Sequence, residues 1–285
     1  MPTVANALTY IDPPGTTPPR PYGLFDVAMG PMEFPDARAP GAGIIYVPNT
    51  CEDDIFLVAT NCPPITGTKT FSSVEAAVSG SPFVVLTTYT CGSLGFTFAE
   101  AEQRVRTRMM LREQRAVEKR VWSGSTGALG TITGLFRSAT SLGDAGCSTE
   151  AIEILEQTLA DNGVVGGIIH TRVGMTPHLA NNHLIESSRG ALKTTPYGTP
   201  YVFGQGYDGS GPTGQAADAS SEWMYASGRI MVWANETMVP PPRETFDRSG
   251  NQMFLAAERF FNVTVECGIW AIRVTRTCTT SGGGT

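Results

Sequence analysis

The sequence predicts a mixed α+β fold, and three observations support that prediction. Residues 97–122 contain no Gly or Pro and consist mostly of good helix formers. Runs of β-branched and aromatic residues, such as residues 82–90 and 253–274, are typical of strands. A second helical pattern over residues 148–163 is followed directly by the apolar run 164–171, which indicates an α/β layer.

The predicted long helix has clear start and stop signals. Thr97 and Glu100 form a capping box, and Ser123 with Gly124 supplies the stop. At ~1.5 Å per residue, residues 97–122 would span roughly 39 Å. The apolar residues form one narrow stripe, and basic residues outnumber acidic ones on the rest of the surface. A solvated surface helix is one interpretation. The other is a helix that crosses a thin protein and meets neighbouring subunits with its charged flanks.

Residues 1–50 are predicted to form an extended arm. Frequent prolines exclude a helix or a central strand, yet the segment is too apolar for a solvated tail. We therefore expect the arm to lie on a surface, either that of its own domain or that of a neighbouring subunit. We expect contacts with a neighbouring subunit from the arm residues Tyr10, Ile11, Tyr22, Leu24 and Phe25.

The other segments alternate between strands, helices and loops. We predict strands within residues 43–49, 54–60, 199–209 and 223–240, with a turn at Ser227-Gly228, and a short helix over residues 175–187. Residues 62–90 are predicted to form a long hairpin, residues 123–148 a loop, and the C-terminal residues a flexible tail.

Composition excludes several classes of protein. The net charge of −6 argues against a protein that coats nucleic acid by bulk charge. The sequence contains no run of ~18 apolar residues, so no membrane span is predicted, and the N-terminus shows no secretory signal. The six cysteines are scattered without a CxxC, so we expect reduced thiols and no zinc site. His178 and His183 are five residues apart and do not share a helix face, so no metal site is expected there.

No motif supports an active site. Gly204, Gly206 and Gly209 match the GxGxxG pattern, but a loop follows them where a dinucleotide site needs a helix. Neither a GxSxG nucleophile elbow nor a Walker A motif occurs, and Ser125 has no evident triad partners. We expect no enzyme, no cofactor, and no catalytic or metal-binding residues.

The order of the predicted parts resembles that of the major capsid proteins of tailed bacteriophages, which have the HK-ninety-seven-like fold that encapsulin nanocompartments also use. The segments MMLREQRAVEKRVWSG, TPYGTPYVFGQGYDGSGP, WMYASGRIMVW and FDRSGNQMFLAAERFFNVTVECG are similar to segments of capsid proteins from actinobacterial phages. These motifs are structural rather than catalytic. The resemblance covers most of the chain.

The resemblance implies a division of the chain into named parts. These are an N-terminal arm (1–50), a peripheral-domain strand region (51–61), an E-loop (62–90), a peripheral domain (91–148 and 243–276) with spine helix 97–122, an axial domain (149–242) and a flexible tail (277–285). Some relatives join an E-loop Lys to a peripheral-domain Asn. Lys69 and Asn251 or Asn262 lie in suitable segments, but the catalytic carboxylate for such a link is not recognisable from sequence.

The resemblance also implies a function. The chain would self-assemble through pentamers and hexamers into the icosahedral head shell of a phage and enclose double-stranded DNA without sequence-specific contact. Scaffolding and portal proteins are the expected partners, with a cementing protein as an optional one. The N-terminal scaffold region of some relatives is missing, so we expect either that it has been cut off or that a separate scaffolding protein does its job. The expected location is the virion, after assembly in the cytoplasm of the host bacterium.

Four arginines of the long helix are expected to pair with acids on adjacent subunits. They are Arg104, Arg108, Arg112 and Arg115. Two alternatives to a phage shell are an encapsulin-like nanocompartment subunit and, from a different class, a hydrolase with an unrecognised site.

Overall fold

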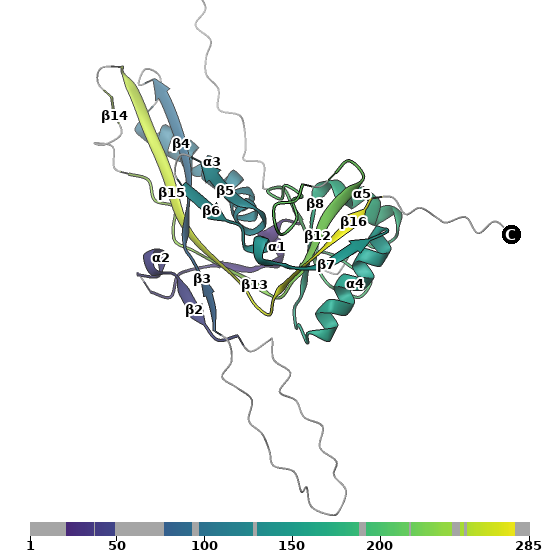
Figure 1. The fold of residues 1–285 in the computed structure, drawn as a ribbon. Helices are drawn as coiled ribbons and strands as arrows, with labels where there is room; N and C mark the ends of the chain where they lie inside the picture. Colours follow the sequence, from purple (N-terminus) through teal and green to yellow (C-terminus); the bar gives the residue numbers. More distant parts are fainter. Residues whose placement is uncertain are drawn as a thin grey trace, which may run out of the picture.

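The computed structural model describes residues 21–36, 38–48, 77–92, 97–127, 130–187, 192–216, 218–240, 246–247 and 250–276. Within these ranges the chain forms two five-stranded sheets, and helices pack against both of them (Figure 1). The predicted α+β class is therefore confirmed. Among the helices of these ranges, none is both long and apolar enough to cross a membrane.

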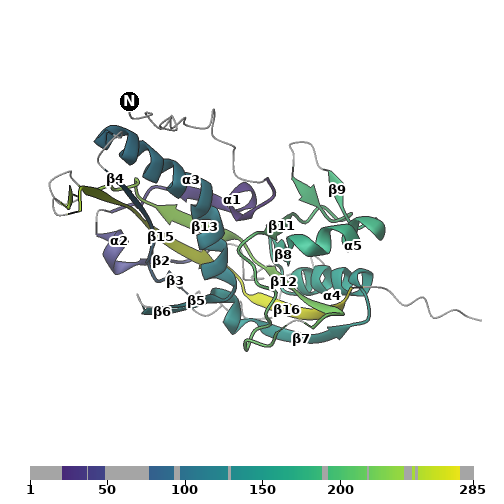
Figure 2. The ribbon, with the colours of Figure 1, turned by 90° about the horizontal axis from the view of Figure 1, so that it is seen from above.

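The first sheet is covered by the long helix α3 (Phe98–Trp122), which crosses one of its faces (Figure 2). The strand order is β1 (Met29–Met32), β13 (Ile230–Ala234), β15 (Gln252–Val265) and β14 (Phe246–Asp247), and β4 (Phe83–Gly92) also pairs with β15. The first half of α3 packs against β15 through Ala101, Val105, Met109, Met253, Leu255 and Ala257. The short elements in the part of the molecule around the first sheet are α1 (Leu24–Val27), α2 (Ala39–Ala42) and the antiparallel pair β2 (Ile44–Tyr46) and β3 (Val78–Gly80).

The second sheet has helices on one face and the end of α3 near the other. Its strand order is β11 (Tyr201–Gly204), β8 (Ile168–Arg172), β12 (Ser221–Ser227), β16 (Ile269–Thr275) and β7 (Thr140–Ala145). Helices α4 (Ser148–Asp161) and α5 (Thr176–Asn181) pack against the first face. The smaller elements are β5 (Gly124–Gly127), β6 (Gly130–Thr133), η1 (Leu135–Ser138), η2 (Val173–Met175), β9 (Glu186–Ser187) and β10 (Lys193–Thr194).

Two of the chain's crossings between the two sheets lie next to each other, one after β12 and one after β15. The amide of Gly228 donates to the Gly268 carbonyl oxygen (3.2 Å), and the amide of Glu266 donates to the Arg229 carbonyl oxygen (3.0 Å). A Cβ at Gly228 would lie 2.2 Å from the Glu266 carbonyl oxygen, so only glycine permits this approach. These crossings join the sheets into one body.

A buried carboxylate fastens three separate segments at this junction. Glu118 of α3 is 0% exposed and accepts hydrogen bonds from the amides of Leu24 (3.0 Å) and Gly206 (2.8 Å). Gln114 Nε2 donates to the same carboxylate (3.1 Å). Burial raises the pKa of Glu118, and these donors partly offset that rise. The carboxylate therefore supplies the acceptors that buried backbone amides require.

An aromatic cluster fills the space between the end of α3 and the second sheet. Trp122 lies 4.4 Å from both Tyr207 and Tyr225, measured between ring centroids, and Phe136 lies 4.8 Å from the ring of His170. His170 Nδ1 lies 3.0 Å from the Tyr207 hydroxyl and Nε2 lies 2.8 Å from Ser227 Oγ. Burial lowers the pKa of His170 to about 3, so the ring is neutral at physiological pH.

Several predicted elements are confirmed. The capping box of Thr97 and Glu100 starts α3, which ends at Trp122. The predicted strand over residues 82–90 is β4, and the predicted strands over residues 253–274 are β15 and β16. The helix over residues 148–163 is α4, which begins at Ser148 with Cys147 as its N-cap.

Other predictions were wrong because long-range pairing decided them. The predicted loop 123–148 contains β5, β6 and β7, and β7 exists because it pairs with β16. The predicted short helix 175–187 extends only over Thr176–Asn181. The expected domain division stays a prediction, and strand pairing runs across its boundaries: β13 lies within 149–242 and pairs with β15, and β16 lies within 243–276 and pairs with β12.

The expectation of reduced thiols is also corrected. Cys91 carries a buried free thiol, whereas Cys267 is disulfide-bonded. Cys267 lies in the turn between β15 and β16 with a φ of 64°. Sequence spacing does not show which cysteines the fold brings together, and the absence of a secretory signal was too weak a guide here.

We predict that Glu118→Ala lowers the free energy of unfolding by roughly 3 kcal/mol or more, because two buried backbone donors lose their acceptor. Urea unfolding of the isolated chain measures this change. Glu102→Ala is the matched control on the same helix, since Glu102 forms only a partly exposed i,i+4 pair with Arg106. Equal effects of the two substitutions would contradict the role assigned to Glu118.

We predict that stability falls on acidification through His170. The folded chain holds His170 neutral down to about pH 3, whereas the unfolded chain takes up a proton below its ordinary pKa of 6.5. The contribution of His170 to the free energy of unfolding is therefore fully present above pH 6.5. Below that pH the free energy of unfolding declines by up to ~1.4 kcal/mol per pH unit. Urea unfolding at pH 7 and pH 5 should show a loss of about 2 kcal/mol from this residue.

His170→Gln provides the comparison for this second prediction. It keeps polar atoms near Tyr207 and Ser227 but does not titrate. Glu113 and Glu118 have raised pKa values and act in the opposite direction above pH 4.5, so only the difference between the two chains isolates His170. Parallel pH profiles for both chains would refute the assignment.

Candidate interaction surfaces

The four arginines that the sequence singled out divide into two pairs. Arg104 Nη1 donates to the Tyr89 hydroxyl of β4 (3.0 Å). Arg108 lies 4.6 Å over the centroid of the Tyr89 ring and donates to the Thr88 carbonyl oxygen (3.2 Å). Both guanidinium groups therefore help to fasten α3 to β4 within the chain.

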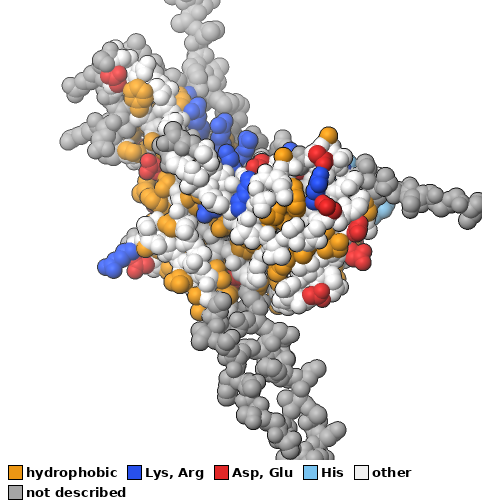
Figure 3. Space-filling view, viewed as in Figure 1, with side chains coloured by type: hydrophobic (Ala, Val, Ile, Leu, Met, Phe, Trp, Pro, Cys, Tyr) orange, Lys and Arg blue, Asp and Glu red, His pale blue; other side chains and the backbone are white. Residues whose placement is uncertain are grey.

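Arg112 and Arg115 differ from this first pair. Both are exposed, and neither has a hydrogen-bond or ion-pair partner among the residues that the structure describes. In Figure 3, Lys and Arg side chains form a row in the region where Figure 1 shows α3. The acids Glu113 and Glu118 of the same helix point inward, where Arg259 Nη1 contacts Glu113 Oε1 at 2.8 Å. The exposed side of α3 around Arg112 and Arg115 is therefore rich in positive charge that has no partner among the described residues.

The expected contacts of the arm need correction. Leu24 is 0% exposed and belongs to the core with Val117 and Val121, so the expectation that it touches a neighbouring subunit was wrong. Phe25 stacks on Phe261 at 6.2 Å, and the Tyr22 carbonyl oxygen accepts from the Phe203 amide (2.8 Å). The sequence indicates that such apolar residues pack against an apolar surface. It does not show whether that surface belongs to the same chain or to a neighbouring subunit.

The remaining residues that the sequence analysis named are two residues of the arm and the three candidates for a cross-link. Tyr10 and Ile11 fall outside the described residues, as does Lys69. Of the two candidate cross-link residues, Asn262 is 0% exposed and donates to the Gly80 carbonyl oxygen (2.8 Å). Asn251 is exposed at a turn. Of these two asparagines, only Asn251 is therefore accessible from outside the subunit.

Exposed apolar side chains lie close to the second half of α3. Val84 and Leu86 of β4 are 43% and 41% exposed, and Ile132 of β6 is 37% exposed. They line a groove of about 380 Å³ between α3, β4 and the β5–β6 hairpin. Within the described residues β4 pairs only with β15, so its other edge is open. Apolar side chains beside an open strand edge are typical of an interaction surface.

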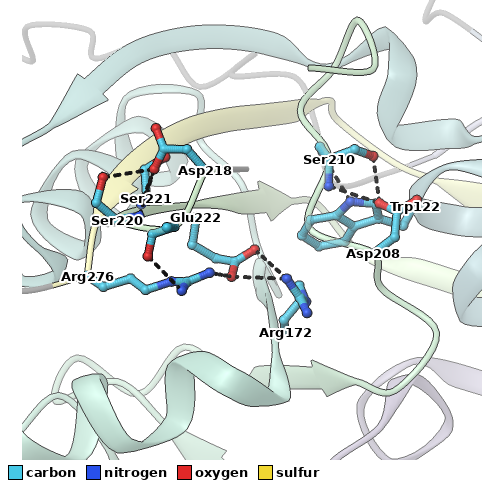
Figure 4. Close-up of polar contacts among 10 residues, drawn as sticks. Trp122, Arg172, Asp208, Ser210, Asp218, Ser220, Ser221, Glu222 and Arg276 are labelled. Carbon is cyan, nitrogen blue, oxygen red and sulfur yellow. Dashed lines mark hydrogen bonds and ion pairs between the residues drawn. The ribbon is translucent and has the colours of Figure 1, made fainter. Parts of the chain in front are cut away.

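Glu222 of β12 and Asp218 of the loop before it are paired within the chain (Figure 4). The carboxylate of Glu222 is 2% exposed as a side chain and contacts Arg172 (3.3 Å) and Arg276 (3.0 Å). Asp218 accepts from Ser220 and Ser221, and these hydrogen bonds hold its pKa well below its usual range. Both carboxylates are occupied with structural contacts, so neither is placed as a general acid or base.

The GxGxxG segment serves packing. A Cβ at Gly206 would lie 2.2 Å from the Arg115 carbonyl oxygen, so glycine allows this loop to touch the backbone of α3. Gly209 has a φ of 80° and lies against Glu222 and Arg172. The glycines therefore connect α3 to the second sheet, and no helix with a free N-terminus follows them.

A buried Ser–His pair is the arrangement closest to catalytic machinery in the described part of the chain. Ser227 Oγ lies 2.8 Å from His170 Nε2, but both residues are 0% exposed. Ser227 donates its hydroxyl proton to the Gly228 carbonyl oxygen (2.8 Å). Its oxygen must therefore accept from His170, so the imidazole carries its proton on Nε2. A serine that accepts from the histidine and meets no solvent is not an activated nucleophile.

Sequence reasoning missed the inward-facing acids of α3. Glu113 and Glu118 were counted among the charges of a solvated surface, yet they are 8% and 0% exposed. The i,i+4 spacing of Gln114 and Glu118 was a weak local signal of a hydrogen-bonded pair. The deciding partners, Leu24 and Gly206, each lie more than 80 residues away in sequence (separations of 94 and 88).

Solved structures with low sequence identity share this fold. A chain of the capsid of an empty GTA particle aligns with a TM-score of 0.58 at 9% identity, over 96% of this chain and 95% of that chain. A chain of Mycobacterium phage Ogopogo gives 0.51 at 12% identity, over 94% and 97%. A chain of Gordonia phage Cozz gives 0.52 at 13% identity, over 87% and 84%.

These likenesses extend over nearly the whole of each chain, so they concern the complete fold and not one shared motif. No protein-family model and no curated protein matches the sequence. The chain therefore has the fold of phage and GTA capsid proteins.

Proposed function

We propose that this chain is the major capsid protein of a tailed bacteriophage, a structural subunit that self-assembles into an icosahedral head shell around double-stranded DNA. The observation that carries the proposal is the capsid-like fold over 96% of the chain. Shell assembly uses surfaces rather than a catalytic centre. The exposed arginines of α3 and the apolar groove beside β4 supply such surfaces.

The two sheets suggest how the parts of a capsid protein map onto the chain. We assign the peripheral domain to the first sheet, with α3 as the spine helix. The axial domain then corresponds to the second sheet with α4 and α5. The N-terminal arm, the E-loop with β4 as its returning strand, and the C-terminal tail complete the subunit.

The partners follow from the same proposal. Copies of the chain form rings of five and six through heterologous contacts that close into a shell. Arg112 and Arg115 pair with acids on adjacent subunits, whereas Arg104 and Arg108 act mainly within the chain. Scaffolding and portal proteins, and a cementing protein if one exists, complete assembly in the host cytoplasm. The net charge of −6 suits an inner wall to which packaged DNA does not adhere.

The alternatives differ in what they enclose or catalyse. An encapsulin-like shell would form particles without DNA. A hydrolase would elute as a monomer or small oligomer. Ser227 and His170 form the Ser–His pair found in the described residues, and their burial argues against a hydrolytic role for this pair. Size-exclusion chromatography with negative-stain microscopy separates the three outcomes, since a phage shell forms uniform large particles and holds DNA in the virion. A chain that stays monomeric even with its scaffold would refute the proposal.

We predict that Arg112→Glu/Arg115→Glu blocks assembly and leaves the subunit folded, because like charges then face each other across the contact. Arg104→Leu/Arg108→Leu is the matched control on the same helix. It should lower the free energy of unfolding by about 1 kcal/mol, through loss of the contacts with Tyr89, and still assemble. Particle yield by sedimentation and urea unfolding of each subunit measure the two effects. Normal yield from the charge-reversed chain would exclude these two residues from the contact.

A further inference from the structure

Arg120, near the end of α3, is a partly buried cation without an acidic partner in the part of the chain that the structure describes. Its guanidinium lies 5.6 Å over the centroid of the Phe83 ring, and Nη1 donates to the Thr133 carbonyl oxygen. Among the described residues its buried Nε has no hydrogen-bond partner, and no carboxylate of these residues forms an ion pair with Arg120. Burial also lowers the pKa of Arg120. A desolvated charge without a counter-ion destabilises the isolated chain.

This cation lies in the groove of about 380 Å³ that contains the exposed apolar residues of β4. Arg120 and Lys119 contribute positive charge to its lining, and Val84, Leu86 and Ile132 contribute apolar surface. The groove follows β4, whose second edge is unpaired within the described residues. Its chemistry fits an extended segment that carries a carboxylate flanked by apolar side chains.

We propose that this groove receives a carboxylate-bearing segment from a second copy of this chain, with the carboxylate bound by Arg120 and Lys119. The proposal deepens the proposed shell function and rests on it. In a closed shell each copy offers one groove and one inserted segment, which is the head-to-tail arrangement of heterologous contacts. Arg120 is thus a residue whose charge costs stability in the free subunit and is compensated on assembly.

Charge and lining favour a protein carboxylate over a nucleic-acid phosphate. Each copy carries 26 acidic and 20 basic residues, so acids are plentiful on any neighbouring subunit. The apolar side chains of β4 and β6 gain from contact with protein, whereas a phosphate backbone would leave them exposed to water. The net charge of −6 also disfavours the approach of a polyanion.

The test compares Arg120→Met, Arg120→Lys and Arg106→Met in two measurements, namely urea unfolding of the subunit and the critical concentration for particle formation. Arg120→Met should leave the subunit as stable as the wild type or more stable, because it removes an uncompensated charge. It should raise the critical concentration about tenfold or more, since the inserted carboxylate loses its partner. Arg120→Lys, which keeps the charge, should recover part of this loss.

Arg106→Met is the control because Arg106 is an exposed arginine of α3 whose partners, Glu102 and the Thr237 carbonyl, lie in the same chain. It should assemble at the wild-type concentration. The inference is overturned if Arg120→Met destabilises the subunit and assembles normally, or if its particles form normally but retain less DNA. If the wild-type chain itself forms no particles, the shell function fails and the inference with it, so the two failures are distinct.

Discussion

The architecture depends on one buried carboxylate at the junction of the two sheets. Glu118 binds the amides of Leu24 and Gly206, and so joins α3 to the segment before β1 and to the loop after β11. The close approach requires glycine at position 206, since a Cβ there would lie 2.2 Å from the Arg115 carbonyl oxygen of the α3 backbone. Buried amides need acceptors, and this carboxylate supplies them where no strand pairing is available.

The inward position of Glu118 also sets the rotation of α3 about its axis. With Glu113 and Glu118 facing the core, the basic residues of the same helix remain on its flanks and outer side. Arg104 and Arg108 then reach Tyr89 of β4, Arg120 lies over Phe83, and Arg112 and Arg115 face solvent. A chain with a net negative charge thus carries a basic row on its surface.

The core between the sheets is polar as well as aromatic, and its polar groups are structural. His170 connects Tyr207 to Ser227 inside a cluster of Trp122 and Phe136, and burial keeps the ring neutral. Such satisfied networks fix one arrangement of a core, because an alternative packing would leave donors and acceptors unpaired. This accounts for histidine, serine and tyrosine in close contact without any catalytic role.

The sequence by itself determined the local elements. The capping box at Thr97 and the absence of Gly and Pro placed α3, and β-branched runs placed β4 and β15, because these signals act over a few residues. The tertiary structure alone decided which strands share a sheet, that β7 is a strand, that Leu24 packs in its own core and that Glu118 faces inward. Each of these depends on partners that are remote in the chain, such as Trp270 opposite Thr140 or Leu24 beside Glu118, and the pattern of neighbouring residues carries no record of such pairings.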